Sequence, residues 1–389
     1  MACFPGPLVI VGSGLAAYAL AREFRKLDTE QPVVLICADN GCQYSKPLLS
    51  TAIAQQKNAD DLATASAADM ADRLGLIIRN NTRVDAIDAE AHRLIIGNER
   101  FPYGKLVLAV GAEAVPLKLD GNAAAQAMTV NSLADYRQLR GHLEQVEAER
   151  PAIVIAGGGL VGCELASDFV SGDYDIDLVC SGEQLLDGLV PAEIATVLRQ
   201  RLENAGVACH LSRRVESLHQ HPQGLLAGLD NRQHLPAHAL ISAIGLRPAT
   251  ALARSAGLTL GQRGIAVDRY LQTSDPDIYA LGDCAEVDGV SLLYVKPLMA
   301  CARALAATLA TTPVRVAYGP MPVTIKTPVM PLLVAAPSRL QPGSWSVDQN
   351  HDGFRAEFRH GDGHLLGYAL TDKRITEQSE LNPQLPEFF

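Results

Sequence analysis

The feature that most constrains the fold is a β-α-β pattern that occurs twice. In the first copy, an apolar run at residues 8–11 leads into a glycine-rich turn, helical spacing over residues 16–27 and a second apolar run at residues 33–37. The second copy repeats this order, with apolar runs at residues 152–156 and 177–179 around a helical segment that ends near residue 170. Such units build parallel sheets, so we predict an α/β protein with two Rossmann-like domains.

The first glycine-rich turn has the spacing of a dinucleotide-binding fingerprint. Gly12, Gly14 and Ala17 form G-x-G-x-x-A, in which the glycines allow a tight turn and close approach of a pyrophosphate, while a methyl group still allows helix packing. The amides at the helix N-terminus would bind that pyrophosphate. Asp39, just after the second apolar run, would accept a hydrogen bond from a ribose hydroxyl. The alternative is a tight turn without a ligand.

The second turn has the complete G-x-G-x-x-G, formed by Gly157, Gly159 and Gly162. Its following strand ends at Cys180, so the nearest carboxylate, that of Glu183, is the candidate for the ribose. No Arg or Lys stands between residues 178 and 189 to hold a 2′-phosphate, which favours NADH over NADPH. Glu164, one turn into the helix, would lie close to a nicotinamide carboxamide, or would simply be a carboxylate near a helix N-terminus.

Composition narrows the class of protein. The 43 acidic and 33 basic residues give a net charge of −10, which argues against nucleic acid as a partner. No apolar run approaches the ~18 residues that span a bilayer, and residues 1–7 lack the charged start of a secretory signal, so we expect a cytoplasmic protein without membrane insertion. The eight cysteines are scattered, which suits a reducing compartment, and we expect no metal site.

Beyond residue 324 the pattern changes to short apolar runs between turn residues. These runs, at residues 332–335, 345–347, 354–358 and 365–369, predict antiparallel strands in a small α+β C-terminal domain. No flexible linker interrupts the chain, so we expect strand crossings near residues 115–120 and 242–246. The expected domains are residues 1–117 with 243–323, residues 118–242, and residues 324–389.

Residues 273–283 read T-S-D-P-D-I-Y-A-L-G-D and predict a strand ending in Gly-Asp. This stretch resembles the T-x₆-Y-A-x-G-D motif of the flavoproteins that bind two dinucleotides, and the resemblance implies that Asp283 bonds the ribityl and pyrophosphate of FAD. Residues 106–112 and 241–248 are similar to the two crossing strands of that family. The resemblance therefore assigns FAD to the discontinuous first domain and NADH to residues 118–242.

The same resemblance implies further contacts to FAD. Lys46 and Pro47, in Y-S-K-P-L-L-S, are similar to the family's pyrophosphate-facing pair, and a helix is expected to start there. Val84 stands where a backbone contact to adenine is usual. Val295 opens an apolar helix whose N-terminus points at the flavin in this family, where its dipole would favour hydride acceptance. Lys326 would add a positive charge at the same edge of the flavin, or would be a surface lysine. Lys326 and Glu164 are the candidate catalytic residues.

The disulfide reductases of this family carry a C-x₄-C pair under the flavin. No cysteine stands in the corresponding segment here, and Cys37 and Cys42 belong to the region that would touch the adenosine ribose. Reduced flavin must then deliver its electrons to an external acceptor. Y-A-L-G-D-C-A-E-V-D-G and Y-G-P-M-P-V-T-I-K-T-P closely resemble bacterial NADH:rubredoxin reductases of the kind that support alkane hydroxylation. The resemblance implies hydride transfer to FAD and two single-electron transfers to rubredoxin.

Rubredoxin is acidic, as this chain is, so we expect docking at a local site near the flavin edge. The candidate cations are Lys296, Arg303 and Lys326. Three alternatives stay open: a reductase of another one-electron carrier, such as a ferredoxin or a flavo-diiron protein; a redox-responsive flavin binding or signalling protein; and a disulfide reductase that uses Cys37 and Cys42.

Overall fold

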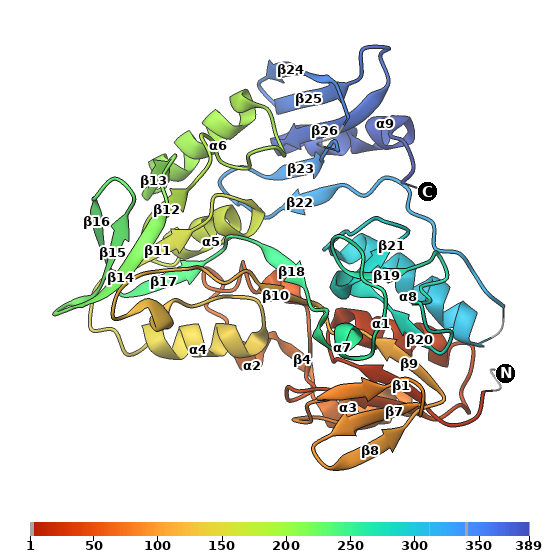
Figure 1. Ribbon diagram of the computed structural model, residues 1–389. Coiled ribbons are helices and arrows are strands. Elements are labelled where there is room, and N and C mark those ends of the chain that lie inside the picture. The colour runs from red at the N-terminus through yellow and green to blue at the C-terminus, as the bar shows by residue number, and fades with distance from the viewer. Residues whose placement is uncertain (1–3, 311, 339–340, 389) are drawn as a thin grey trace.

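The computed structural model describes residues 4–310, 312–338 and 341–388. Its first parallel sheet has the strand order β20-β9-β1-β2-β5 (Figure 1). The strands are β20 (Ile278–Ala280), β9 (Lys105–Leu108), β1 (Leu8–Val11), β2 (Val33–Ile36) and β5 (Ile77–Arg79). All four residues of β1 and of β2 are buried, as strands covered on both faces require. Helix α1 (Leu15–Arg25) connects β1 to β2 and packs against α8 (Val295–Ala310).

The second parallel sheet has the order β13-β12-β11-β17. Its strands are β13 (Val207–Leu211), β12 (Asp175–Cys180), β11 (Ala152–Ala156) and β17 (Ala239–Ser242). Helix α5 (Leu160–Val170) crosses from β11 to β12, and α6 (Ala192–Asn204) crosses from β12 to β13. A three-stranded antiparallel sheet, β14 (Val215–His221), β15 (Gly224–Leu229) and β16 (His234–Ala237), follows in sequence. The second β-α-β unit is therefore present as predicted.

Two short antiparallel strands pair where the chain passes between the sheets. They are β10 (Ala112–Ala114) and β18 (Leu246–Pro248), in the register Ala112 to Pro248. Gly111 and Gly245 precede them with φ values of 69° and 124°, a left-handed region that glycine enters without steric penalty. The paired strands hold the two Rossmann-like sheets at one shared edge.

The C-terminal segment forms an antiparallel sheet of order β22-β23-β26-β25-β24, drawn in blue at the top of Figure 1. The strands are β22 (Val323–Ile325), β23 (Leu332–Ala335), β26 (Leu365–Thr371), β25 (Gly353–Arg359) and β24 (Ser344–Asn350). The sheet lies beside α6, where the Arg201 guanidinium donates to both oxygens of Asp372 at 2.7 and 3.1 Å. This bidentate pair ties the C-terminal sheet to the second unit.

Shorter elements complete the described chain. They are β3 (Gln43–Tyr44), β4 (Ala63–Ala65), β6 (Ala86–Asp88), β7 (Arg93–Ile96), β8 (Glu99–Pro102), β19 (Ile265–Val267), β21 (Ala285–Val287), α2 (Ala59–Leu62), α3 (Ala67–Leu74), α4 (Leu133–Leu143), α7 (Ala251–Ser255) and α9 (Gln378–Leu381). None of the helices within the described ranges is both long and apolar enough to cross a membrane.

The predicted fold class is confirmed, and three details of the prediction change. The prediction of a helix that starts at Lys46 is wrong. A 3-10 turn covers Lys46–Leu48, and the chain then bends. It bends because the amides of Ile53 and Ala54 donate to the carboxylate of Asp168 and not to carbonyl groups one helical turn earlier. The strand expected over residues 273–283 is limited to Ile278–Ala280. The antiparallel strands β6–β8 and β14–β16 were not anticipated. The domain limits stay a prediction.

Candidate functional site

Both glycine-rich turns line a single cleft of about 1630 Å³. Its wall is formed by the carboxyl ends of strands from both parallel sheets, by the N-terminus of α8 and by β22. Ligands of α/β proteins bind at this end of parallel strands. The structure brings these predicted residues to the wall: Gly12, Gly14, Asp39, Lys46, Pro47, Val84, Gly157, Gly159, Glu164, Asp283, Val295, Lys296 and Lys326.

The first glycine of each turn has no room for a side chain. Gly12 and Gly157 have φ values of 119° and 125°. A Cβ on Gly12 would lie 2.3 Å from the carbonyl oxygen of Ala109, and one on Gly157 would lie 2.4 Å from that of Ala243. Glycine is therefore required at both positions, because the turn passes against the end of a neighbouring strand.

The second and third positions of the glycine motif have different roles. Gly14 and Gly159 have no atom within 4 Å of a built Cβ, so each leaves open space over its helix N-terminus, where a pyrophosphate could approach the backbone amides. A Cβ on Gly162 would lie 1.8 Å from the carbonyl oxygen of Gly157, so this residue serves the packing of α5. Ala17 is fully buried in α1. The cleft therefore fits two dinucleotides, one on each turn.

Asp39 is held in place by a residue that sequence reasoning missed. The hydroxyl of Ser13, between the two glycines, donates to both Asp39 carboxylate oxygens at 2.6 and 2.8 Å. The Gly41 amide donates to the same carboxylate at 3.0 Å. These bonds join the glycine-rich turn to the end of β2 and fix a carboxylate at the cleft wall, as binding of a ribose requires. A serine in the middle of the fingerprint was the available signal.

Lys46 and Asp283 are half-buried at the cleft wall and lie within electrostatic reach of each other. Burial lowers the pKa of Lys46, and the charge of Asp283 opposes that shift. Burial raises the pKa of the Asp283 carboxyl, and the charge of Lys46 opposes that shift in turn. Each group therefore stabilises the charged form of the other in a poorly solvated place. Such a pair suits a ligand that presents both phosphate oxygens and hydroxyl groups.

Glu164 is almost fully buried, and three donors surround it. The Ser50 hydroxyl donates to Oε2 at 2.5 Å, the backbone amide of Lys326 donates to Oε1 at 2.8 Å, and the Lys326 ammonium donates to Oε2 at 3.1 Å. The same ammonium donates to Ser50 Oγ at 2.9 Å and to the carbonyl of Pro47. Prediction placed Glu164 and Lys326 at one reaction site, and the structure joins them directly. Ser50 was missed.

One turn further along α5, a second carboxylate holds the same loop. Asp168 is buried, and its oxygens accept from the amides of Ile53 at 2.9 Å and Ala54 at 3.0 Å. Burial raises the pKa of the Asp168 carboxyl, and the amide donors oppose that shift. Glu164 and Asp168 together fix residues 47–54, which close the cleft between the two turns.

Besides Ala17 and Gly162, which pack inside their helices, two predicted residues do not reach the cleft wall. Glu183 has an exposed side chain and is not part of the lining, which on that side consists of Cys180, Ser181, Gly182 and Asp187. Its role with the NADH ribose stays a prediction without support from the geometry. Arg303 is exposed on α8, away from the lining, where a docked protein could still reach it.

Cys37 and Cys42 are free thiols in this structure. Cys37 is buried beside Asp39, and burial raises the pKa of its thiol to about 12, so the reactive thiolate is disfavoured at neutral pH. Their segment belongs to the Asp39 end of the cleft and not to the end that holds Glu164 and Lys326. This environment argues against a redox pair.

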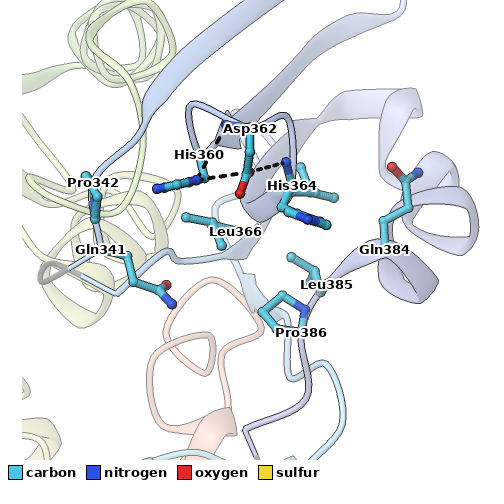
Figure 2. Close-up of a pocket in the computed structure, with 10 residues that line it drawn as sticks. Gln341, Pro342, His360, Asp362, His364, Leu366, Gln384, Leu385 and Pro386 are labelled. Carbon is cyan, nitrogen blue, oxygen red and sulfur yellow. Dashed lines mark hydrogen bonds and ion pairs between the residues drawn. The ribbon is translucent and has the colours of Figure 1, made fainter.

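A second, smaller cavity of about 450 Å³ lies in the C-terminal region and is shown in Figure 2. His360, Asp362 and His364 occupy one hairpin turn, in which His360 Nδ1 lies 2.9 Å from an Asp362 oxygen and the His364 amide donates to Asp362 at 3.1 Å. These contacts join residues of the turn to one another. Among the described residues no cluster of three or more metal-binding side chains was found. The large cleft is therefore the candidate site.

A fold with two dinucleotide-binding turns facing one cleft defines a class of two-nucleotide oxidoreductases. The family model of the pyridine nucleotide-disulphide oxidoreductases matches residues 6–307, and that of the rubredoxin binding C-terminal domain matches residues 315–385. The chain belongs to the pyridine nucleotide-disulphide oxidoreductase family, in its rubredoxin-NAD(+) reductase group. Members of this family use FAD and NAD(H).

Full-length relatives support this assignment. The chain is 42% identical over 381 residues to the rubredoxin-NAD(+) reductase of Alcanivorax borkumensis, with 98% of each sequence covered. It is 40% identical to the enzyme of the same name from Acinetobacter baylyi, covering 94% of this chain and 93% of the relative. It is also 38% identical to the nitric oxide reductase FlRd-NAD(+) reductase of Escherichia coli O139:H28, covering 97% and 99%.

Solved structures agree on the fold. The putidaredoxin reductase in its covalent complex with putidaredoxin superposes with a TM-score of 0.88 at 24% identity, covering 99% of this chain and 94% of that chain. The NADH:rubredoxin oxidoreductase from Clostridium acetobutylicum superposes with a TM-score of 0.80 at 17% identity, covering 98% and 94%. At these identities the similarity concerns architecture alone.

The geometry of the second turn predicts that two alanine substitutions change different properties, stability in one case and NADH binding in the other. Gly162→Ala places a methyl group against the Gly157 carbonyl, so we expect α5 to shift and the free energy of unfolding to fall by about 1–3 kcal/mol. Gly159→Ala, at φ −83° with open space, should change stability by less than about 1 kcal/mol yet weaken NADH binding about tenfold. Urea unfolding and NADH titration measure both. Equal stability losses would contradict this division.

The cluster around Glu164 predicts a coupled effect on stability. Lys326→Met should lower the free energy of unfolding by about 2 kcal/mol, because it leaves the Glu164 charge buried; the value is reduced because the Lys326 side chain is 31% exposed. Adding Glu164→Gln should recover part of that loss, since an amide needs no counter-charge. A double-mutant cycle from urea unfolding measures the coupling, and purely additive losses would show that the two side chains act independently.

Proposed function

We propose that this protein oxidises NADH, holds the electrons on FAD and passes them singly to rubredoxin. The observation that carries the proposal is the single cleft with two dinucleotide turns, joined to a C-terminal sheet that matches the rubredoxin-binding model. Two of the relatives described above, at 42% and 40% identity, are rubredoxin-NAD(+) reductases. Support of alkane hydroxylation is the pathway role that we propose for these electrons, in the cytoplasm.

The residues have separate tasks in this proposal. The turn of Gly12 and Gly14, with Asp39 and Asp283, would hold FAD, and the turn of Gly157 and Gly159 would hold NADH. Lys46, Pro47, Val84 and Val295 would add to the FAD wall. When bound, FAD would accept a hydride from NADH and release electrons one at a time.

Glu164 and Lys326 would keep the region between the two turns rigid. Their hydrogen bonds with Ser50 fix the loop after Lys46 against α5, so that two bound nucleotides are held in one relative position. Proximity of this kind lowers the entropic part of a transfer barrier. The N-terminus of α8 also faces the cleft through Tyr294, Val295 and Lys296, where its positive dipole end favours negative charge on a ligand.

The positions of the cysteines support transfer of electrons to an external acceptor. Within the described chain, the cysteines at the cleft wall are Cys37 and Cys180, which stand at the strand ends after the two glycine units. The segment Lys46–Leu48 and residues 321–330 contain no cysteine to receive electrons. The proposed path therefore leads from the flavin to a docked protein.

Three cations were predicted for that docking, and they differ in availability. Lys296 and Arg303 are exposed on α8, so their charges face solvent. Lys326 is committed to Glu164, Ser50 and the Pro47 carbonyl, so its charge is largely neutralised. We propose docking on the N-terminal part of α8, where Val295 is 37% exposed and supplies an apolar contact.

A second acceptor is supported by one comparison. The relative from Escherichia coli, 38% identical, is named for reduction of the FlRd of a nitric oxide reductase. A rubredoxin-like module of a flavo-diiron protein could present the same surface to this chain. The signalling alternative requires slow reduction and a long-lived complex with NADH, and the disulfide alternative requires Cys37 and Cys42.

The decisive experiment is anaerobic reduction of the purified yellow protein by NADH, followed by turnover with rubredoxins, ferredoxins and a FlRd-type module. We expect rubredoxin to be reduced fastest. Lys296→Gln with Arg303→Gln should raise the KM for rubredoxin about three- to tenfold at low salt and flatten its salt dependence, with turnover of ferricyanide maintained.

The control for charge is Arg232→Gln, compared with each single variant, Lys296→Gln and Arg303→Gln. It removes one positive charge from the turn between β15 and β16, far from α8 in Figure 1. It should leave the KM for rubredoxin unchanged. An equal effect of the control would mean that overall charge, and not a surface on α8, governs docking. Loss of all NADH-driven turnover in the Cys37→Ser, Cys42→Ser double variant would instead favour the disulfide reductase.

A further inference from the structure

The strand end that should bind the NADH ribose lacks its carboxylate. In dinucleotide-binding units, an acidic residue at the end of the second strand accepts hydrogen bonds from the adenosine ribose. Here β12 ends at Cys180, a buried residue whose thiol has its pKa raised by burial and therefore stays neutral. The carboxylate of Glu183, three residues later, is exposed and does not line the cleft.

The chain after β12 folds back over the glycine turn. The backbone amide of Leu186 donates to the Gly158 carbonyl at 2.9 Å, and the Leu189 amide donates to the Leu186 carbonyl at 2.9 Å. Leu185 and Leu186 are fully buried, which anchors this segment in the core. Leu186 has a φ of 54°, a left-handed conformation that is unfavourable for a leucine and persists where its surroundings enforce it.

The enforced turn presents the next residue to the cleft. Asp187 has an exposed side chain and lines the wall together with Cys180, Ser181 and Gly182. A Cβ on Gly182 would lie 3.4 Å from the Asp187 Cβ, so a side chain there would crowd the aspartate. The charge of Asp187 also contributes to raising the pKa of the Cys180 thiol, which places the carboxylate within electrostatic reach of the strand end.

Arg213 lies beside the end of β12 but outside the cleft wall. The backbone amide of Arg213 donates to the Cys180 carbonyl at 3.0 Å, which brings the end of β13 beside the end of β12. Its guanidinium, however, donates to the Ser212 carbonyl at 2.7 Å, and Arg213 is not part of the cleft wall. Of the charged side chains near this strand end, that of Asp187 is therefore the one that lines the cleft.

We propose that Asp187 binds the adenosine ribose of NADH and excludes the 2′-phosphate of NADPH, in the role that a strand-end carboxylate would otherwise have. This inference rests on the proposed use of NADH. Two acceptor oxygens suit the ribose hydroxyls as donors, and the negative charge opposes a phosphate at the same place.

The test uses the holoenzyme and the variant Asp187→Asn, with Glu183→Gln as matched control, since both remove one charge from the same segment. Calorimetry with ADP-ribose and with 2′-phospho-ADP-ribose measures binding, and kcat/KM for NADH and NADPH measures use. We expect Asp187→Asn to weaken ADP-ribose about tenfold and to shift the NADH to NADPH preference by at least about tenfold. The control should stay within about twofold.

The proposal is overturned if Asp187→Asn leaves both the affinities and the preference unchanged, or if Glu183→Gln produces the shift. Flavin content and thermal unfolding confirm that each variant is folded, and Asp187→Ser provides a second replacement. Failure of NADH to reduce the wild-type protein would overturn the proposed function, whereas the binding of ADP-ribose to wild type and variant would still decide the role of Asp187.

Discussion

The buried carboxylate of Glu164 joins three segments that are far apart in the sequence. Its donors come from Ser50 and from Lys326, so that α5, the loop after the 3-10 turn and the start of the C-terminal sheet meet at one point. Asp168 lies four residues later on the same helix face and holds the amides of Ile53 and Ala54. Two carboxylates at this spacing would repel each other if they stood alone. Here an amide, a hydroxyl and an ammonium donate to Glu164, and two amides donate to Asp168.

This arrangement explains why the cleft keeps its shape. A buried carboxylate that loses a partner destabilises the fold, by about 2 kcal/mol where the lost partner is the partly exposed Lys326, so separation of the three segments is unfavourable. Helix α5 bears both carboxylates, and it packs closely against the glycine-rich turn because Gly162 has no side chain. A Cβ at this position would clash with the Gly157 carbonyl. Packing of α5 against the glycine turn and hydrogen bonding of α5 to the neighbouring loop therefore act on the same element, and both fix the distance between the two nucleotide sites.

Local patterns predicted most of the fold, and long-range contacts account for what they missed. The glycine turns, their flanking strands and the C-terminal antiparallel runs follow from spacing within about 30 residues. The helix expected at Lys46 failed because Asp168, more than a hundred residues away, takes the amides that a helix would have used. Ser50 could not be predicted either, because its partner Glu164 lies 114 residues away in the sequence. Glu183 was chosen by distance along the chain, whereas the left-handed turn at Leu186 decides which carboxylate reaches the wall.

The net charge of −10 makes the manner of nucleotide binding informative. Two dinucleotides bring several phosphate charges to a protein that is itself acidic, so overall attraction cannot supply their affinity. In the proposed binding mode, backbone amides at two helix N-termini would supply it instead, and their effect is confined to the first turn of each helix. The open space above Gly14 and Gly159 is what admits the phosphates to those amides. Side-chain carboxylates can then line the same cleft at Asp39, Asp187 and Asp283. In the proposed binding mode, Asp39 and Asp187 would meet ribose hydroxyl groups and not phosphates.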